Sequence, residues 1–190
     1  MKKKFWFLIP IILLAVIFSL LIFGQKSIFL KNKESIQQTG KQTNMKISSP
    51  AFQNNEIIPR RYTCDGENIS PPLAFEEIPE GTQSLLLIVD DPDAPRGTFL
   101  HWLVFNISPQ TKLIEENSLP NGARLGKNDF GQLTYGGPCP PYGVHRYYFK
   151  LFALDTTLNL PEGASFQEVW GAARDHILSE NHLIGLYKRE

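Results

Sequence analysis

The hydrophobic pattern of the chain begins with an unbroken apolar run. Residues 5–23 carry no charged side chain, and Lys2, Lys3 and Lys4 precede them. A helix of this length spans roughly 28 Å, close to the ~30 Å hydrocarbon core of a bilayer. The positive-inside rule keeps the lysines in the cytoplasm and sends the rest of the chain outward. The pattern predicts a transmembrane signal anchor over residues 1–23; the alternative is a cleaved signal peptide and a secreted domain.

A polar segment follows the apolar run. Residues 24–44 are rich in Lys, Gln, Asn, Thr and Ser. Such a composition buries too little apolar surface to offset the entropy of ordering the chain. We interpret this segment as a flexible linker to an extracytoplasmic domain over residues 45–190, which is long enough for one hydrophobic core.

Beyond the linker, short apolar and aromatic runs alternate with turns rich in Pro and Gly. Ser84–Val89, His101–Ile107 and Tyr147–Leu154 have the composition of strands, and His182–Tyr187 is a further candidate. The chain contains 14 Gly and 14 Pro, which suits many tight connections. Strands in series with little helix predict a mainly β fold, a β-sandwich.

One or two short helices are expected near the C-terminus. Ser165 and Glu168 have the spacing of a capping box, and apolar residues follow at helical spacing from Phe166 through Ile177. The predicted helix therefore begins after Ser165 and extends to about Ile177.

The charge distribution bears on the partners of the domain. Before Met45 the chain has seven Lys and one Glu, a balance of +6, whereas the remaining 12 basic and 18 acidic residues give −6. Nucleic-acid binding depends on Lys and Arg that neutralise phosphates. We therefore expect no nucleic-acid partner.

A few polar residues at strand ends mark a candidate site. Asp91 and Asp93 end an apolar strand, His101 opens an aromatic one, and His145 and Tyr147 open another. We expect these groups to converge at one rim of the sandwich. Histidine and tyrosine can donate hydrogen bonds to an anion, and a carboxylate can hold an imidazole in one tautomer.

Each of these residues also has a simpler interpretation. Asp91 and Asp93 are common turn formers, and His101 could be a rim histidine without a ligand. Two histidines with a carboxylate suit zinc, but no tight ligand spacing is present, so we predict neither a metal nor a cofactor. Arg146 is expected to pair with Asp93.

In order and spacing, these motifs resemble the phosphatidylethanolamine-binding protein family. The segments that carry the resemblance are Asp91-Pro92-Asp93-Ala94-Pro95, His101-Trp102-Leu103-Val104, and Gly137-Pro138-Cys139-Pro140-Pro141 with His145-Arg146-Tyr147. Tyr62–Leu73 is similar to the prokaryotic branch, often called Raf kinase inhibitor-like. The resemblance covers residues 46–190 and implies an antiparallel β-sandwich with Greek-key topology and a small anion pocket at one end.

The resemblance also implies which residues bind the ligand. They are Asp91, His101, His145 and Tyr147, with Ala94 and Pro95 in the wall and Pro140 and Pro141 in the opposite loop. The implied ligand is a phosphate, a phospholipid head group or a carboxylate on a partner, and a protease or kinase is an implied target of inhibition. Phe75 replaces a Trp of animal relatives, and the loop before His145 is short, so the pocket shape differs.

Cys64 and Cys139 are the only two cysteines. Both flank the pocket that the resemblance implies, and an outward-facing domain permits a disulfide. We favour a Cys64–Cys139 disulfide over two free, partly buried thiols.

These observations predict a binding module and not an enzyme. No G-x-S-x-G elbow is present, and no Ser or Cys is clearly paired with a base. Residues 129–131 match the kinase D-F-G tripeptide by chance, because the other kinase motifs are absent. Two alternatives stay open: a phosphoester-processing enzyme that uses Asp91, His101 and His145, and a purely structural β-sandwich that presents loops to a partner.

Overall fold

A computed structural model describes residues 44–189 of the chain. The predicted transmembrane helix over residues 1–23 and the linker up to residue 43 lie outside the described residues. Between residues 44 and 189, no helix is long and apolar enough to cross a bilayer.

The domain is built mainly from strands in two sheets. The larger sheet has the strand order β2-β9-β8-β4-β5-β7, and the smaller has the order β1-β3-β6. The strands are β1 Lys46–Ser48, β2 Glu56–Ile57, β3 Leu73–Glu76, β4 Ser84–Asp91, β5 Phe99–Ile107, β6 Leu113–Ile114, β7 Arg124–Leu125, β8 His145–Leu154 and β9 Ile177–Tyr187. All neighbours are antiparallel except β2, which runs parallel to β9. The expected antiparallel arrangement therefore has one exception, at an edge of the larger sheet.

The continuous apolar run of Ser84–Val89 forms most of strand β4, which is covered on both faces. All eight of its residues are buried, and it pairs with both β5 and β8. Leu85, Leu87 and Val89 pack into the core between the two sheets, whereas Leu86 and Ile88 pack into a second core on the other face. A strand covered on both faces cannot alternate apolar with polar residues.

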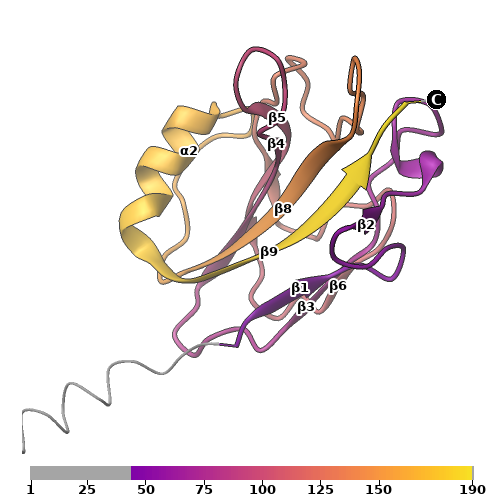
Figure 1. Ribbon diagram of the computed structural model, residues 1–190. Helices are drawn as coiled ribbons and strands as arrows, with labels where there is room; N and C mark the ends of the chain where they lie inside the picture. The colour runs from indigo at the N-terminus through magenta and orange to yellow at the C-terminus, as the bar shows by residue number, and fades with distance from the viewer. Residues whose placement is uncertain (1–43, 190) are drawn as a thin grey trace, which may run out of the picture. The chain divides into compact units, whose positions relative to one another are not determined.

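The second core lies beneath helix α2, Phe166–Ala173, so the domain has three layers: the small sheet, the large sheet and the helix (Figure 1). The predicted capping box is present. Ser165 Oγ accepts from the Glu168 amide at 3.3 Å, and Glu168 Oε2 accepts from the Ser165 amide at 2.8 Å. Both donors would otherwise lack an intrahelical partner.

The predicted C-terminal end of this helix is wrong. The helix stops at Ala173, a 3-10 turn spans Arg174–His176, and Ile177 begins β9. Ile177 pairs with Leu154 of β8, so long-range strand pairing overrides the local helical spacing. A second 3-10 turn, Arg60–Tyr62, was not expected from the sequence.

Candidate functional site

The candidate site lies at one end of the three central strands of the large sheet. Asp91 is the last residue of β4, and His145 and Tyr147 open β8 beside it. Asp91 pairs with Phe99 of β5, which places His101 two residues further along the same strand. Because neighbouring strands are antiparallel, the end of β4 meets the beginnings of β5 and β8. The structure thus brings Asp91, His101, His145 and Tyr147 together.

Asp91 and His145 form the charged part of the site. Nδ1 of His145 lies 2.7 Å from Oδ2 of Asp91, and both side chains are buried. A carboxylate accepts this bond, so Nδ1 of His145 carries a proton. The carboxylate therefore fixes the tautomer and the ring orientation, and Nε2 is left for another partner.

His101 is held in the same way by the backbone of the loop before β8. Its Nδ1 lies 2.7 Å from the carbonyl oxygen of Gly136, which can only accept. The Gly136 amide in turn donates to the carbonyl oxygen of His101 at 3.0 Å. Burial lowers the pKa of His101, which favours the neutral ring. In that form Nδ1 donates to Gly136 and Nε2 is an acceptor.

Tyr147 lies between the two imidazoles. Its ring meets that of His101 edge-on at 5.2 Å and stacks with that of His145 at 6.5 Å between centroids. The hydroxyl is buried and has no hydrogen-bond partner within residues 44–189. Burial and the nearby charge of Asp91 raise the pKa of Tyr147, so the hydroxyl keeps its proton. Asp91 and the Cys139 backbone lie near this hydroxyl, but neither accepts a hydrogen bond from it with good geometry.

The two histidines lie at the strand ends, and their side chains are buried. His101 is 3% exposed and His145 4%. Aromatic rings pack against His101: the ring centroids of Phe99 and Phe130 lie 5.2 and 5.5 Å from that of His101.

Arg146 and Asp93 brace the turn beside the site. The guanidinium donates from Nε to Asp93 Oδ2 at 2.8 Å and from Nη2 to Oδ1 at 2.6 Å. The Arg146 amide adds a third bond to Oδ2 at 3.0 Å. These bonds lower the pKa of Asp93 to about 2. The expected pairing of Arg146 with Asp93 is present, and it fixes the β4–β5 turn to the start of β8.

The sequence of this domain matches one family over almost its whole length. Residues 48–188 fit the family model described as phosphatidylethanolamine-binding protein. The chain belongs to the phosphatidylethanolamine-binding protein family. Its membership supports a ligand-binding regulatory domain in general terms.

Two relatives of this family member are UPF0098 proteins. A UPF0098 protein of Methanothermobacter thermautotrophicus is 53% identical over 150 residues, which cover 76% of this chain and 99% of the relative. A UPF0098 protein of Aquifex aeolicus is 51% identical over 153 residues, covering 77% of this chain and 90% of the relative.

Two solved structures share the fold of this family member. A putative phosphatidylethanolamine-binding protein homolog of Chlamydia trachomatis, CT736, superposes with a TM-score of 0.75 at 38% identity and covers 78% of this chain and 100% of its own. YbcL of E. coli, described as a member of the mammalian family, gives a TM-score of 0.73 at 30% identity, with 77% and 99% coverage. Both confirm the mainly β fold.

The expected wall residues lie in the two loops that flank the strand ends of this phosphatidylethanolamine-binding domain. Ala94 is half-buried and Pro95 exposed in the β4–β5 turn, whereas Pro140 is buried and Pro141 exposed in the loop before β8. In that loop the exposed ring of Tyr142 approaches His145, at 6.4 Å between centroids. The four residues thus belong to the segments that border the imidazoles.

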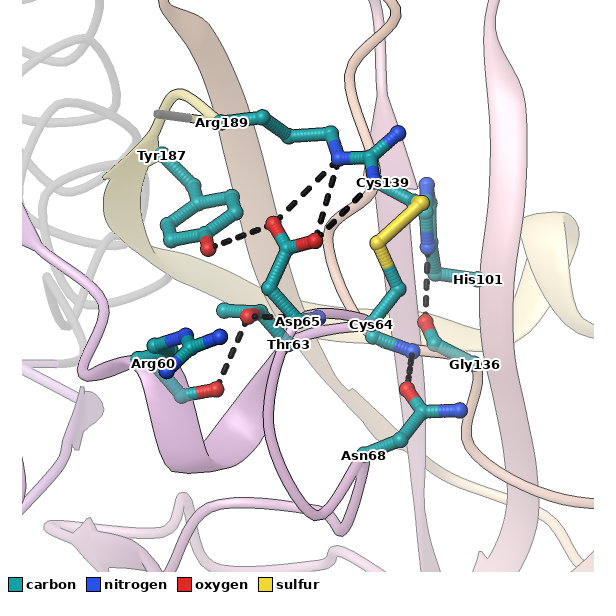
Figure 2. Close-up of a disulfide and its surroundings, with 11 residues drawn as sticks. Arg60, Thr63, Cys64, Asp65, Asn68, His101, Gly136, Cys139, Tyr187 and Arg189 are labelled. Carbon is teal, nitrogen blue, oxygen red and sulfur yellow. Dashed lines mark hydrogen bonds and ion pairs between the residues drawn. A yellow bond between two sulfur atoms is a disulfide. The ribbon is translucent and has the colours of Figure 1, made fainter.

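A disulfide and a glycine hold the loop that positions His101. Cys64 and Cys139 are bonded, with 5.4 Å between their Cα atoms, and the Gly137 amide donates to Asn68 Oδ1 at 2.8 Å (Figure 2). A Cβ on Gly137 would lie 2.5 Å from that oxygen, so only glycine fits this approach. The segment 60–68 is thereby tied to the Gly136 carbonyl, and so to His101.

Sequence reasoning missed two contributors to the site. Gly136 binds His101 through a backbone carbonyl, which leaves no mark in a side-chain pattern. Phe130, which covers His101, belongs to the tripeptide set aside as a chance kinase match. An aromatic residue close to the Gly-rich loop was the only signal in the sequence that Phe130 lies near the site.

Proposed function

We propose that the domain binds a small anion, a phosphate or a phospholipid head group, through His101, His145 and Tyr147. One observation carries the proposal: the buried Tyr147 hydroxyl, whose ring contacts both imidazoles, makes no hydrogen bond within residues 44–189. Nδ1 of each imidazole is already used, which leaves both Nε2 atoms, and the buried Tyr147 hydroxyl is a donor without an acceptor. Buried polar groups are normally satisfied, so an exception indicates a ligand.

The protonation states specify the anion more closely. Tyr147 donates to one oxygen, and His145 donates from Nε2 when it carries its second proton. The neutral His101 can only accept at Nε2, so it suits a phosphate oxygen that bears a proton, or it takes up a proton when an anion binds. Donation from His145 requires a proton on its Nε2, so the bound complex holds at least one proton more than the separate dianion and a domain with two neutral imidazoles. Binding of phosphate therefore strengthens as the pH falls from 8 to 6.

We propose binding and not turnover. The group of Asp91, His101, His145 and Tyr147 contains no Ser, Thr or Cys that an imidazole could activate, and the hydroxyl of Tyr147 stays protonated. Both imidazole Nδ1 atoms are fixed by hydrogen bonds, which suits a rigid binding site.

The test is calorimetric titration of the domain with inorganic phosphate and with glycerophosphoethanolamine at pH 6 and pH 8. His101→Gln and His145→Gln should each weaken binding roughly 10- to 100-fold, the cost of one charge-assisted hydrogen bond. His182→Gln, on the exposed side of β9, is the matched control and should bind as the parent does. Thermal melts establish that each variant is folded. Unchanged affinity in both site variants would refute the proposal, and release of phosphate from a phosphoester would favour the enzyme alternative.

A further inference from the structure

A second carboxylate at the end of β4 faces away from the candidate site. Asp90 and Asp91 are consecutive, and residues next to each other in a strand point to opposite faces of the sheet. Asp90 is 6% exposed, and its Oδ2 lies 2.5 Å from Nζ of Lys150. Its Oδ1 is buried without a hydrogen-bond partner in the described part of the chain. Burial raises the pKa of Asp90, although Lys150 opposes that shift.

Asp90 lines a cavity of about 400 Å³ on the helix side of the sheet. Leu100 and Phe166 supply apolar wall, and Lys127 and Asp129 supply charge. This volume lies within the range of small-molecule sites, which combine apolar walls with a few fixed polar groups. None of these residues belongs to the group around Tyr147.

The backbone of Leu100 connects the two carboxylates that line the cavity, those of Asp90 and Asp129. Asp90 pairs with Leu100 across β4 and β5. Asp129 is bound to Leu100 twice: its Oδ2 accepts from the Leu100 amide at 2.7 Å, and its amide donates to the Leu100 carbonyl at 3.0 Å. These bonds orient the Asp129 carboxylate and leave Oδ1 without a protein donor among residues 44–189. Oδ1 of Asp90 is thus a buried oxygen without a donor in the described part of the chain, and the exposed Asp129 adds a second carboxylate that its bond to Leu100 orients.

Lys127 provides the opposite charge at the same cavity. Its ammonium forms no ion pair with any residue between 44 and 189, whereas Lys150 is already paired with Asp90. A simple anion would meet two carboxylates here, and a simple cation would meet the free ammonium of Lys127. A ligand that carries both charges complements all three groups.

We propose that this cavity is a second binding site, for a zwitterionic amino compound of the α-amino acid class. The ligand ammonium donates to Oδ1 of Asp90 and of Asp129, its carboxylate pairs with Lys127, and its apolar side chain packs against Leu100 and Phe166. The inference is independent of the proposed anion site, because the two sites lie on opposite faces of the sheet.

The experiment titrates the domain in phosphate-free buffer with L-leucine and with its two half-molecules. These are 3-methylbutan-1-amine, which lacks the carboxylate, and 4-methylpentanoate, which lacks the ammonium. L-leucine should bind at least tenfold more tightly than either. Asp129→Asn should weaken leucine binding roughly tenfold without changing the affinity for the pentanoate, and Lys127→Met should weaken it similarly without changing the affinity for the amine.

Two variants serve as controls. Glu162→Gln, an exposed carboxylate just before α2, and His145→Gln, at the anion site, should both bind leucine as the parent does. Asp90→Asn should show the largest loss of leucine affinity. Because this substitution also disturbs Lys150, a thermal melt must show that the variant is folded. If the variant is unfolded, Asp129→Asn and Lys127→Met decide the outcome. No binding of leucine, equal binding of the amine alone, or full affinity in both Asp129→Asn and Lys127→Met would overturn the inference.

Discussion

Asp91 accepts a hydrogen bond from His145 at 2.7 Å across two paired strands, β4 and β8, although 54 positions separate the residues in the chain. Both side chains are buried, so the bond is shielded from water and its geometry is fixed by the sheet. His145 therefore presents Nε2, and not Nδ1, to any ligand at the strand ends.

Asp91→Asn tests this relationship. The amide oxygen can still accept from Nδ1, but the bond loses its charge assistance, and charge-assisted bonds are about twice as strong as neutral ones. We expect phosphate affinity to fall roughly tenfold at pH 7. Calorimetric titration measures the affinity, and Glu162→Gln, at an exposed carboxylate before α2, is the control. An Asp91→Asn protein with parental affinity would remove Asp91 from the site.

Tyr147→Phe should change the stability of the domain and its phosphate affinity in opposite directions. The variant removes a buried hydroxyl without a protein partner, and such a group costs about 1–3 kcal/mol when unsatisfied. We expect the ligand-free domain to become more stable by about 1 kcal/mol while phosphate affinity falls roughly tenfold. Urea unfolding and calorimetry provide the two values. A loss of stability together with unchanged binding would mean that the hydroxyl is structural.

His101 should make the stability of the free domain depend on pH. Its pKa is lower when folded than when unfolded, so the unfolded chain binds more protons just below the ordinary value of about 6.5. Stability is therefore full above that value and is lost as the pH falls through it towards the lower folded pKa. Urea unfolding between pH 8 and pH 5 should show the decline, and His101→Gln should flatten it. Phosphate should also reduce this decline in stability. An identical decline in His101→Gln would assign the pH dependence to another group.

The Cys64–Cys139 disulfide should stabilise the domain and order the loop before β8. The bond joins residues 75 positions apart, for which the chain-entropy model gives about 4 kcal/mol. Cys64→Ser with Cys139→Ser should lower the melting temperature, and hydrogen exchange in residues 136–144 should increase. Mass spectrometry under non-reducing conditions should find both sulfurs protected from alkylation. Full alkylation of the native protein without reductant would show that the thiols are free.

The apolar run over residues 5–23 predicts that the full-length chain stays in the membrane with the domain outside. After expression of the complete chain, alkaline extraction should leave it in the membrane fraction, and its intact mass should include the first residues. Protease added to the outer face should remove the domain. A soluble protein that begins near Gln25 would instead establish cleavage and secretion.

Local patterns were sufficient where one interaction dominates. The spacing of Ser165 and Glu168 predicts the capping box that the structure contains. The continuous apolar run of Ser84–Val89 predicts a strand that is buried on both faces. The two-residue strand β2 has no periodicity to detect, and its parallel pairing depends on the distant Gly185. Ile177 followed the helical spacing but pairs with Leu154, a contact that no local window contains.

The sequence predicted which side chains form the site, but not their hydrogen-bond partners or their burial. Asp91, His145 and Tyr147 stand at strand ends in the sequence and meet in the structure. The carbonyl of Gly136, the burial of His101 beneath Phe130, and the open oxygen of Asp90 follow from the tertiary packing of loops. These features depend on which atoms are already satisfied, and a sequence does not record that.

Strand β4 also limits how this protein can change during evolution. All eight of its residues are buried, and the five from Leu85 to Val89 belong to one core or the other, so a new side chain there must first preserve the fold. The segments 92–98 and 141–144 escape this constraint over most of their length, because they are largely exposed. Divergence in ligand preference among relatives should therefore accumulate in these two loops, and a mutant library restricted to them would explore new specificities at little risk to folding.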